Sequence, residues 1–160
     1  MNWDTITNII LIAAIAVLGV FGLLGIYQWA TRKRFTKIDR NLRFAIIPTA
    51  LMVITYFVFD HFLIWNTRPN GTGEPSFPSS HTMLVATVFA LAAINLPKYI
   101  RSKPLLIILD CLMFILVALT AVGRVLANQH WASDVVGAFI FSAIFIAIYY
   151  ITLRKEPTHA

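Results

Sequence analysis

The sequence predicts an all-α membrane protein, a polytopic bundle of five transmembrane helices. Of its 160 residues, 59% are hydrophobic and only 12% are charged, so too few polar side chains exist to cover a soluble globule. Apolar runs of about 20 residues, the length that crosses the hydrocarbon core of a bilayer, recur along the chain. We therefore expect residues 1–160 to form a single integral membrane domain.

The first two expected spans differ in their ends. Residues 6–30 carry no charge and end at Trp29 beside the basic stretch 31–34, an aromatic and basic border that is typical of a membrane interface. The second run, residues 44–65, carries the pair Asp60–His61 near its far end. Ionisable groups are costly in hydrocarbon, so this pair is expected at or near the opposite interface.

The remaining three spans follow a polar segment. Residues 66–80 are dense in Pro, Gly, Asn and Ser, a composition typical of a loop. The chain then becomes apolar over residues 82–100, and the pair Ser79–Ser80 just before this run predicts a capped helix N-terminus. Two further apolar runs, at residues 105–122 and 135–153, complete the five.

The basic residues predict the orientation of the bundle. Eleven of the 13 Lys and Arg residues follow the first, third and fifth spans. Because cytoplasmic loops carry such an excess, we expect the N-terminus outside and the C-terminus in the cytoplasm. This placement between apolar runs accounts for the net charge of +6 without a nucleic-acid partner. The other two basic residues, Arg68 and Arg124, fall in the outer loops, where the rule does not require them.

The outer face also collects most of the reactive side chains. With the two arginines it holds three of the four histidines, two serines and an aspartate: His61, Ser79, Ser80, His81, His130 and Asp134. Any one of them has an ordinary explanation, since interfacial His and Arg commonly reach for water or pair with a neighbour. Together they are poorly explained in this way, because tens of apolar residues separate them and the alternating topology returns them all to one plane. The fourth histidine, His159, lies in the C-terminal tail.

This set of residues has the chemistry of a site for a phosphate monoester or diphosphate. The guanidinium groups of Arg68 and Arg124 offer planar pairs of donors that match phosphoryl oxygens, and they stay charged at any working pH. A helix that begins at Ser79–Ser80 adds free backbone N–H groups, hydroxyls and the positive end of its dipole. These donors can stabilise the equatorial oxygens, so the scheme requires no metal or other cofactor.

Two histidines can divide the chemistry. His130 and Asp134 are four residues apart, which places them on one helix face, where the carboxylate can accept a ring N–H and fix the tautomer. The other ring nitrogen is then free to attack phosphorus and form a phosphohistidine. His81, at the same helix mouth as the serines, is placed to give a proton to the leaving oxygen and afterwards to deprotonate water.

At these residues the sequence resembles the type 2 phosphatidic acid phosphatase superfamily. That family has three ordered motifs: Lys, six residues, Arg-Pro; then Pro-Ser-Gly-His; then Ser-Arg, five residues, His, three residues, Asp. Here Arg68-Pro69 ends the first motif and Pro78-Ser79-Ser80-His81 is the second. Arg124, His130 and Asp134 reproduce the spacing of the third. Each motif alone is a weak signal, and the ordered triple is a strong one.

The resemblance implies a role for each matching residue. His130 would be the nucleophile, Asp134 its partner and His81 the general acid. Phosphate contacts would come from Arg68, Arg124 and Ser79, and from the backbone N–H of Ser80.

Three departures from the family pattern predict weaker phosphate binding with the chemistry retained. His61 stands where the first motif has lysine, and it can donate to phosphate but is cationic only when protonated. Ser80 replaces glycine, and Gly123 replaces the serine before Arg124, which removes one hydroxyl donor. The resemblance covers residues 40–150, roughly. Residues 1–39 would then be an extra first span with a basic cytoplasmic loop, and this span would be peripheral. The family's common membrane form has six spans, and the one that precedes the first span here would be absent.

The leading hypothesis is a plasma-membrane lipid phosphatase whose active site faces the extracytoplasmic side. Its substrate would be a polyprenyl diphosphate such as undecaprenyl diphosphate, phosphatidylglycerophosphate or phosphatidic acid, and the sequence does not choose among them or indicate an oligomeric state. A first alternative is a zinc-dependent membrane hydrolase with His61, His81 and His130 as ligands. A second is a small anion transporter that uses Asp110 and the outer arginines. Vanadium haloperoxidases share the motifs, but they are soluble and five apolar spans argue against them.

Overall fold

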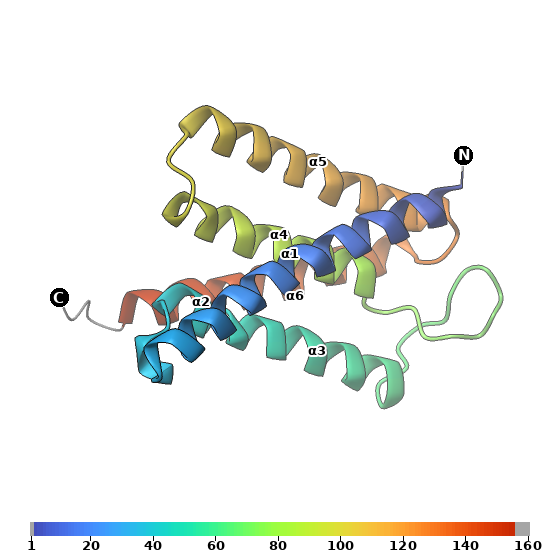
Figure 1. The fold of residues 1–160 in the computed structure, drawn as a ribbon. Helices are drawn as coiled ribbons and strands as arrows, with labels where there is room; N and C mark the ends of the chain where they lie inside the picture. The colour runs from blue at the N-terminus through green and yellow to red at the C-terminus, as the bar shows by residue number, and fades with distance from the viewer. Residues whose placement is uncertain (1, 156–160) are drawn as a thin grey trace.

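The protein is described here by a computed structural model that covers residues 2–155, which leaves His159 and the C-terminal residue outside the described range. The described chain is helical apart from its turns and loops (Figure 1). Its α-helices are α1 (Trp3–Arg32), α2 (Arg40–Phe44), α3 (Ile46–His61), α4 (Ser80–Asn95), α5 (Lys103–Leu126) and α6 (Ala132–Lys155). Short 3-10 turns, η1 (Phe35–Lys37) and η2 (Leu96–Lys98), follow α1 and α4.

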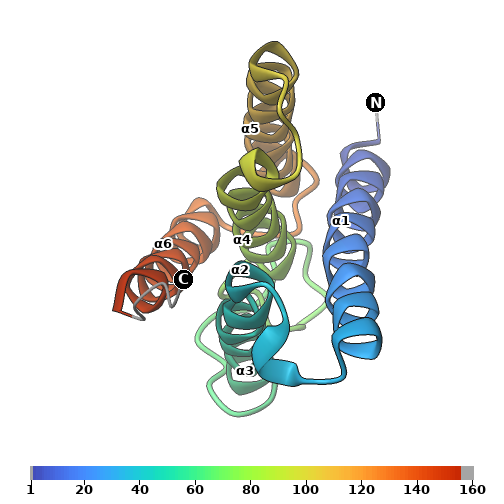
Figure 2. The same cartoon turned by 60° about the vertical axis from the view of Figure 1, so that its left-hand side comes forward.

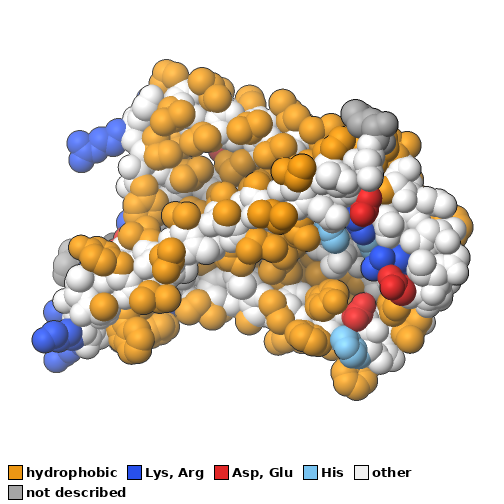
Figure 3. Space-filling view, turned by 45° about the vertical axis from the view of Figure 1, so that its right-hand side comes forward, with side chains coloured by type: hydrophobic (Ala, Val, Ile, Leu, Met, Phe, Trp, Pro, Cys, Tyr) orange, Lys and Arg blue, Asp and Glu red, His pale blue; other side chains and the backbone are white. Residues whose placement is uncertain are grey.

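Five stretches of the described chain are long and apolar enough to cross a membrane, so the predicted all-α architecture with five membrane helices is confirmed. They are Trp3–Arg32, Arg40–His61, Ser80–Lys98, Lys103–Leu126 and Ala132–Lys155. Large apolar side chains cover much of the outer surface of the bundle, as a lipid-facing surface requires (Figure 3).

Helix α4 is the centre of the bundle. It contacts α1, α3, α5 and α6 (Figure 2). Accordingly, 56% of its most apolar stretch is buried inside the protein, against 11% for α1 and α5. Because α4 begins at Ser80, the second motif lies at the end of the most enclosed helix.

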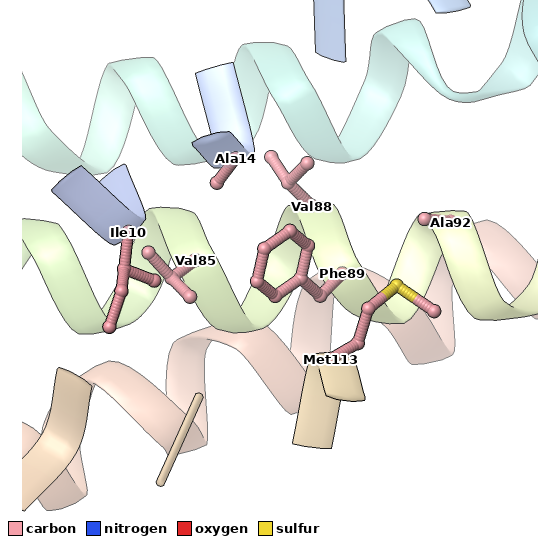
Figure 4. Packing of buried hydrophobic residues seen from close by; sticks show 7 residues of the cluster. All are labelled: Ile10, Ala14, Val85, Val88, Phe89, Ala92 and Met113. Atoms are coloured by element: carbon pink, nitrogen blue, oxygen red, sulfur yellow. The ribbon is translucent and has the colours of Figure 1, made fainter. Parts of the chain in front are cut away.

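The first span is part of the core, which corrects the expectation that it is peripheral. Ile10 and Ala14 of α1 pack against Val85, Val88, Phe89 and Ala92 of α4 and Met113 of α5 (Figure 4). In lipid, such packing depends on close van der Waals contact more than on removing apolar surface from water, and a small residue such as Ala14 lets two helices approach. The apolar run alone could not show this, since a lipid-facing helix and a packed one have the same composition.

The second span is broken near its start. Helices α2 and α3 meet at Ala45, and Pro48 follows in the first turn of α3. Proline has no N–H to donate to the carbonyl of Phe44, so the ladder of helical hydrogen bonds is interrupted at this point.

The same span ends four residues before its predicted limit of Trp65. The carbonyl of Val58 accepts hydrogen bonds from both Phe62 N and Leu63 N, at 3.0 and 2.9 Å, and this double closure terminates α3 at His61. Residues 62–65 therefore leave the helix as an exposed apolar segment.

The end of the bundle that carries the Lys- and Arg-rich segments after α1, α4 and α6 is termed the basic end. The carboxylate of Asp39 connects several of its segments. It accepts a hydrogen bond from Gln28 Nε2 at 3.0 Å and forms ion pairs with Arg32 at 3.0 Å and Lys98 at 3.1 Å. Burial alone would raise the pKa of Asp39, but the hydrogen bonds from these three side chains lower it to about 2. One charged group thus connects α1, the start of α2 and η2.

At the other end, Phe77 anchors the long loop between α3 and α4 to the bundle. Its ring lies in edge contact with Phe59 of α3, with centroids 5.3 Å apart, and 6.4 Å from the ring of Phe141 of α6. Helix α6 can approach because residue 137 is glycine: a Cβ there would overlap Cε2 of Phe77. The absence of a side chain at Gly137 therefore determines where the loop rests.

We expect Gly137→Ala to destabilise the protein by about 1–3 kcal/mol, because the added methyl group overlaps the ring of Phe77 and forces it to move. Thermal unfolding in detergent measures the change. Gly19→Ala is the matched control, since a Cβ at Gly19 meets nothing within 4 Å. Equal melting temperatures for the two variants would contradict this view of the contact.

Candidate active site

The segments that carry the motifs meet at one end of the bundle, which we term the motif end. It comprises residues 2–8, 61–81 and 124–134, and lies opposite the loops that carry most of the basic residues (Figure 1). Figure 3 shows histidine, acidic and basic side chains gathered at this end, whereas Lys and Arg side chains project from the other.

The loop of residues 66–79 folds back on itself. Ser76 N donates to the carbonyl of Asn66 at 2.9 Å, and a single β-bridge pairs Thr67 with Pro75. The chain reverses through Gly71 and Gly73, whose φ values of 79° and 75° lie in the left-handed region that glycine adopts without strain. These contacts bring the two ends of the loop together, so Arg68, near its start, and Ser76, near its end, belong to one closed loop.

Hydrogen bonds join this loop to the connection between α5 and α6. Trp131 Nε1 donates to the carbonyl of Thr67 at 2.8 Å, and Ser79 N donates to the carbonyl of Asp134 at 3.1 Å. The second of these bonds links motif two directly to motif three. The predicted convergence of distant motifs therefore has a defined backbone basis.

His130 is held by the loop through one ring nitrogen. Its Nδ1 lies 2.8 Å from the carbonyl oxygen of Ser76 and the side chain is 3% exposed. Since a carbonyl only accepts, Nδ1 carries the proton and the lone pair of the neutral ring lies on Nε2. Nε2 is buried and has no hydrogen-bond partner within residues 2–155.

The predicted hydrogen bond from His130 to Asp134 is not formed. Nδ1 lies 3.7 Å from Oδ2 of Asp134, which is beyond hydrogen-bond length. That oxygen instead accepts from Trp131 N at 2.9 Å, at the start of α6. The four-residue spacing does bring the pair together, but the backbone carbonyl of Ser76 lies closer to the ring and takes the bond. Asp134, fully buried, orders the turn that carries His130.

Arg124 is nearly fully buried and is held by α1. Its Nη1 donates to Oδ1 of Asp4 at 2.7 Å and lies 3.5 Å from Oγ1 of Thr7. Sequence reasoning did not find either partner. A signal was present, because Asp4 is the one charged residue before Arg32 and so stands alone beside a long apolar run.

Arg68 lies nearer the surface than Arg124. Its Nη1 is 2.9 Å from Oε2 of Glu74 and 3.0 Å from Oε1 of Gln129, so it bridges the loop to the segment that precedes His130. Both predicted arginines thus reach the motif end, each with a carboxylate neighbour.

His81 lies on the first turn of α4, where its Nε2 is 2.8 Å from Oδ1 of Asn8. The charges of Arg124, His130 and Arg68 act on the ring of His81, so His81 belongs to the same cluster of side chains. The predicted capped helix start is also confirmed. Ser79 is the N-cap of α4 and its buried hydroxyl accepts from Thr82 N at 3.5 Å.

The start of α4 leaves donors available for an anion. The carbonyl of Ser79 accepts from Met83 N at 2.9 Å, and its hydroxyl serves Thr82. Helical geometry gives the N–H groups of Ser80 and His81 no acceptor within the helix. These two N–H groups and the helix dipole favour negative charge at this position.

His61 stands apart from the other predicted phosphate ligands. Its Nδ1 pairs with Asp60 at 3.4 Å, its ring lies 5.6 Å from that of Phe57, and its side chain is 54% exposed. The described structure shows no contact between His61 and the cluster around His130. The early end of α3 explains this, because the chain leaves the helix here and travels through residues 62–67 before Arg68.

The zinc-site alternative has no geometric basis in the described residues. It required His61, His81 and His130 to converge, and within residues 2–155 no three His, Cys, Asp or Glu side chains are arranged to hold a metal ion.

Three buried side-chain atoms lack a hydrogen-bond partner in the described structure, and all three belong to the motif end: Ser76 Oγ, Arg124 Nε and His130 Nε2. Leaving such groups unpaired is costly, so their concentration at one place is typical of a ligand site. Two donors and one lone pair suit an anion with an electrophilic centre. Ser76 was not predicted, since it lies outside the three motifs.

The ring of His130 is neutral over a wide pH range. Burial lowers its pKa, and the positive charges of Arg124 and Arg68 lower it further, while the hydrogen bond to Ser76 opposes them, which leaves the pKa at about 4. The unpaired Nε2 is therefore a free base at neutral pH, as a nucleophile must be.

Comparison with known proteins yields a family match over most of the chain. The sequence model of the PAP2 superfamily matches residues 49–157. The chain is also similar to a lipid A 1-phosphatase of Porphyromonas gingivalis, with 33% identity over 94 residues that make up 57% of this chain and 20% of the relative. It thus spans about a fifth of that relative's length.

A solved structure has the same fold. The crystal structure of a transmembrane PAP2-type phosphatidylglycerolphosphate phosphatase from Bacillus subtilis superposes with a TM-score of 0.68 at 17% sequence identity. The similarity covers 99% of this chain and 78% of that one.

We expect the ring of His130 to titrate near pH 4 and not near 6.5. Between these values the unfolded chain binds a proton that the folded protein does not, so the stability that His130 contributes is present above pH 6.5, approximately, and is lost as the pH falls toward 4. Histidine ring NMR in detergent, with His130→Ala to assign the signals, measures the midpoint. A midpoint at 6.5 or above would show that the ring is not buried beside two arginines.

Proposed function

Because the chain belongs to the PAP2 superfamily, as its three ordered motifs predict, we propose that it is an integral membrane lipid phosphatase that works through a phosphohistidine on His130. One observation carries the proposal. His130 presents a buried, neutral and unpartnered Nε2, while its Nδ1–H is held by the carbonyl of Ser76. A histidine that served only packing would pair both nitrogens or expose one to water.

In the first step, Nε2 of His130 attacks the phosphorus atom of the substrate. The new N–P bond forms as the bond from phosphorus to the leaving oxygen breaks, and His81, in its doubly protonated form, gives that oxygen a proton and becomes neutral. The ring of His130 becomes positively charged as it is phosphorylated. The Ser76 carbonyl, which accepts the Nδ1–H, stabilises this charge.

In the second step, water attacks the phosphohistidine. His81, which lost its proton in the first step, takes one from the water, the N–P bond breaks, and inorganic phosphate leaves with its new oxygen. His130 returns to its neutral form, and the proton on His81 restores the starting state.

The phosphoryl oxygens are held by donors from three segments. Arg124 and Arg68 supply charged N–H groups, and the start of α4 supplies the N–H groups of Ser80 and His81. Ser79 supports this arrangement as the N-cap, since its hydroxyl is engaged with Thr82. We assign His61 a place at the rim, where it meets the substrate before the cluster does.

The active site faces the extracytoplasmic side of the plasma membrane in this proposal. The loops after the first, third and fifth spans carry eleven of the 13 basic residues, and they lie at the end opposite the motifs. The N-terminus is then outside and the C-terminus in the cytoplasm.

The substrate class is a phosphorylated lipid. The two similar proteins act, by name, on lipid A and on phosphatidylglycerolphosphate, so a phosphate on a membrane lipid is what they share. We propose a polyprenyl diphosphate such as undecaprenyl diphosphate, phosphatidylglycerophosphate or phosphatidic acid, with lipid A as a further member of the test panel.

Purified protein is expected to release inorganic phosphate from at least one lipid of this panel, and His130→Ala is expected to reduce the rate by about 10³-fold or more, because it removes the attacking atom. Cys111→Ala is the control, since this exposed cysteine of α5 lies outside the motif end. Inhibition by vanadate, with no effect of chelators, would distinguish this mechanism from a zinc hydrolase. Failure on the whole panel contradicts the function, and a loss of only a few-fold contradicts the nucleophile.

Sidedness is tested with single cysteines in a Cys111→Ala background. Thr72→Cys, in the exposed loop of the motif end, should react with a membrane-impermeant maleimide in intact cells. Thr36→Cys, in exposed η1 at the basic end, should react only after the cells are permeabilised. The reverse pattern would place the active site in the cytoplasm.

A further inference from the structure

We propose that Asp4 and Asn8, on the first two turns of α1, are positioning residues that hold Arg124 and His81 for the reaction. This inference rests on the proposed function. It concerns a helix that lies wholly outside the family match at residues 49–157, and that the sequence motifs do not include.

A continuous chain of polar contacts runs along the start of α1. Arg124 Nη1 donates to Oδ1 of Asp4 at 2.7 Å, and the second oxygen of Asp4 accepts from Asn8 Nδ2 at 3.4 Å. Oδ1 of Asn8 then lies 2.8 Å from His81 Nε2. Two residues on successive turns of α1 thereby connect a phosphate-binding arginine with the general acid.

The order of donors and acceptors in this series of hydrogen bonds determines which nitrogen of His81 carries the proton. A carboxylate only accepts, so Asp4 orients the amide of Asn8 with its NH₂ group toward the carboxylate. The amide oxygen must then face His81, and an oxygen needs a donor there. Nε2 of His81 is therefore protonated, and Asp4 controls this tautomer without touching the ring.

The close packing of α1 on α5 fixes the position of Asp4 relative to Arg124. A Cβ on Gly123 would lie 2.7 Å from Cγ2 of Thr7 and 3.2 Å from Cε3 of Trp3. Thr7 is fully buried and its hydroxyl donates to the carbonyl of Asp4 at 3.1 Å. Gly123, where the family pattern has serine, leaves the space that α1 fills.

The same packing accounts for the hydroxyl that this departure removes. Oγ1 of Thr7 lies 3.5 Å from Nη1 of Arg124, so α1 brings a hydroxyl to the arginine that the residue at 123 does not supply. The nearly fully buried guanidinium also needs a counter-charge, which Asp4 provides. Helix α1 thus completes the environment of Arg124 with a hydroxyl and a carboxylate.

The tautomer of His81 can be measured without substrate. In protein labelled with ¹⁵N-histidine and held in detergent at mildly alkaline pH, we expect Nε2 of His81 to be protonated and Nδ1 to be a free base, with His81→Gln to assign the signals. Asp4→Asn should convert this state to a mixture of tautomers, because an amide can donate as well as accept and no longer orients Asn8. Asn8→Leu should also abolish the preference for the Nε2 proton.

Thr5→Val is the matched control. Thr5 lies on the same turn of α1, and its exposed side chain makes none of the contacts in the chain from Arg124 to His81. This variant should leave the tautomer unchanged. A proton on Nδ1 in the wild-type protein, or an unchanged tautomer in both Asp4→Asn and Asn8→Leu, would overturn the inference.

Kinetics supply a second measurement. Asn8→Leu should lower kcat about tenfold and change KM less than twofold, roughly, because a hydrogen bond to the general acid is lost while the phosphate ligands remain. An unchanged kcat contradicts a role for Asn8 in the reaction. A wild-type protein that turns over no lipid phosphate contradicts the proposed function alone, since the tautomer is determined without turnover.

Discussion

The hydrogen bond between Nδ1 of His130 and the carbonyl of Ser76 is the interaction on which the site depends, because it does two things at once. It closes the loop of residues 66–79 onto the segment before α6, and it determines which ring nitrogen keeps its lone pair. A carbonyl performs the second task without a negative charge, and its hydrogen bond raises the pKa of the ring by less than burial and the positive charges of Arg124 and Arg68 lower it. Burial and two nearby arginines then keep it neutral.

The bundle supports this arrangement by enclosing α4. Four helices contact it, and its N-terminus lies at the motif end, where the loops converge. Lipid provides little hydrophobic drive between helices, so position is set by close contacts such as Gly137 against Phe77 and Gly123 against Thr7. Both glycines lie on helices and both face an element that carries or contacts the site. Glycines on the supporting helices thus allow the close approach that positions the segments around the polar cluster.

Helix α1 changes how the family pattern is understood in this chain. Two of its residues contact the cluster through charge and hydrogen bonds, and a third, Thr7, fills the space above Gly123. The substitution of glycine for serine therefore coincides with the approach of another helix, and a departure that predicts weaker binding is accompanied by a replacement hydroxyl. At the basic end, one carboxylate, that of Asp39, likewise pairs with side chains of two other segments, Arg32 of α1 and Lys98 of η2.

The sequence by itself determined the fold class, the five spans, the capped start of α4 and the family, since these depend on local composition and on the spacing of neighbours in one segment. Only the tertiary structure decided that Ser76 and not Asp134 holds His130, that α1 joins the core, and that His61 pairs with Asp60 on the surface. These outcomes depend on which atoms of separate segments come within about 3 Å of one another. Every residue has a backbone carbonyl, so the sequence does not show which one will accept a hydrogen bond. An apolar helix has the same composition whether it faces lipid or protein.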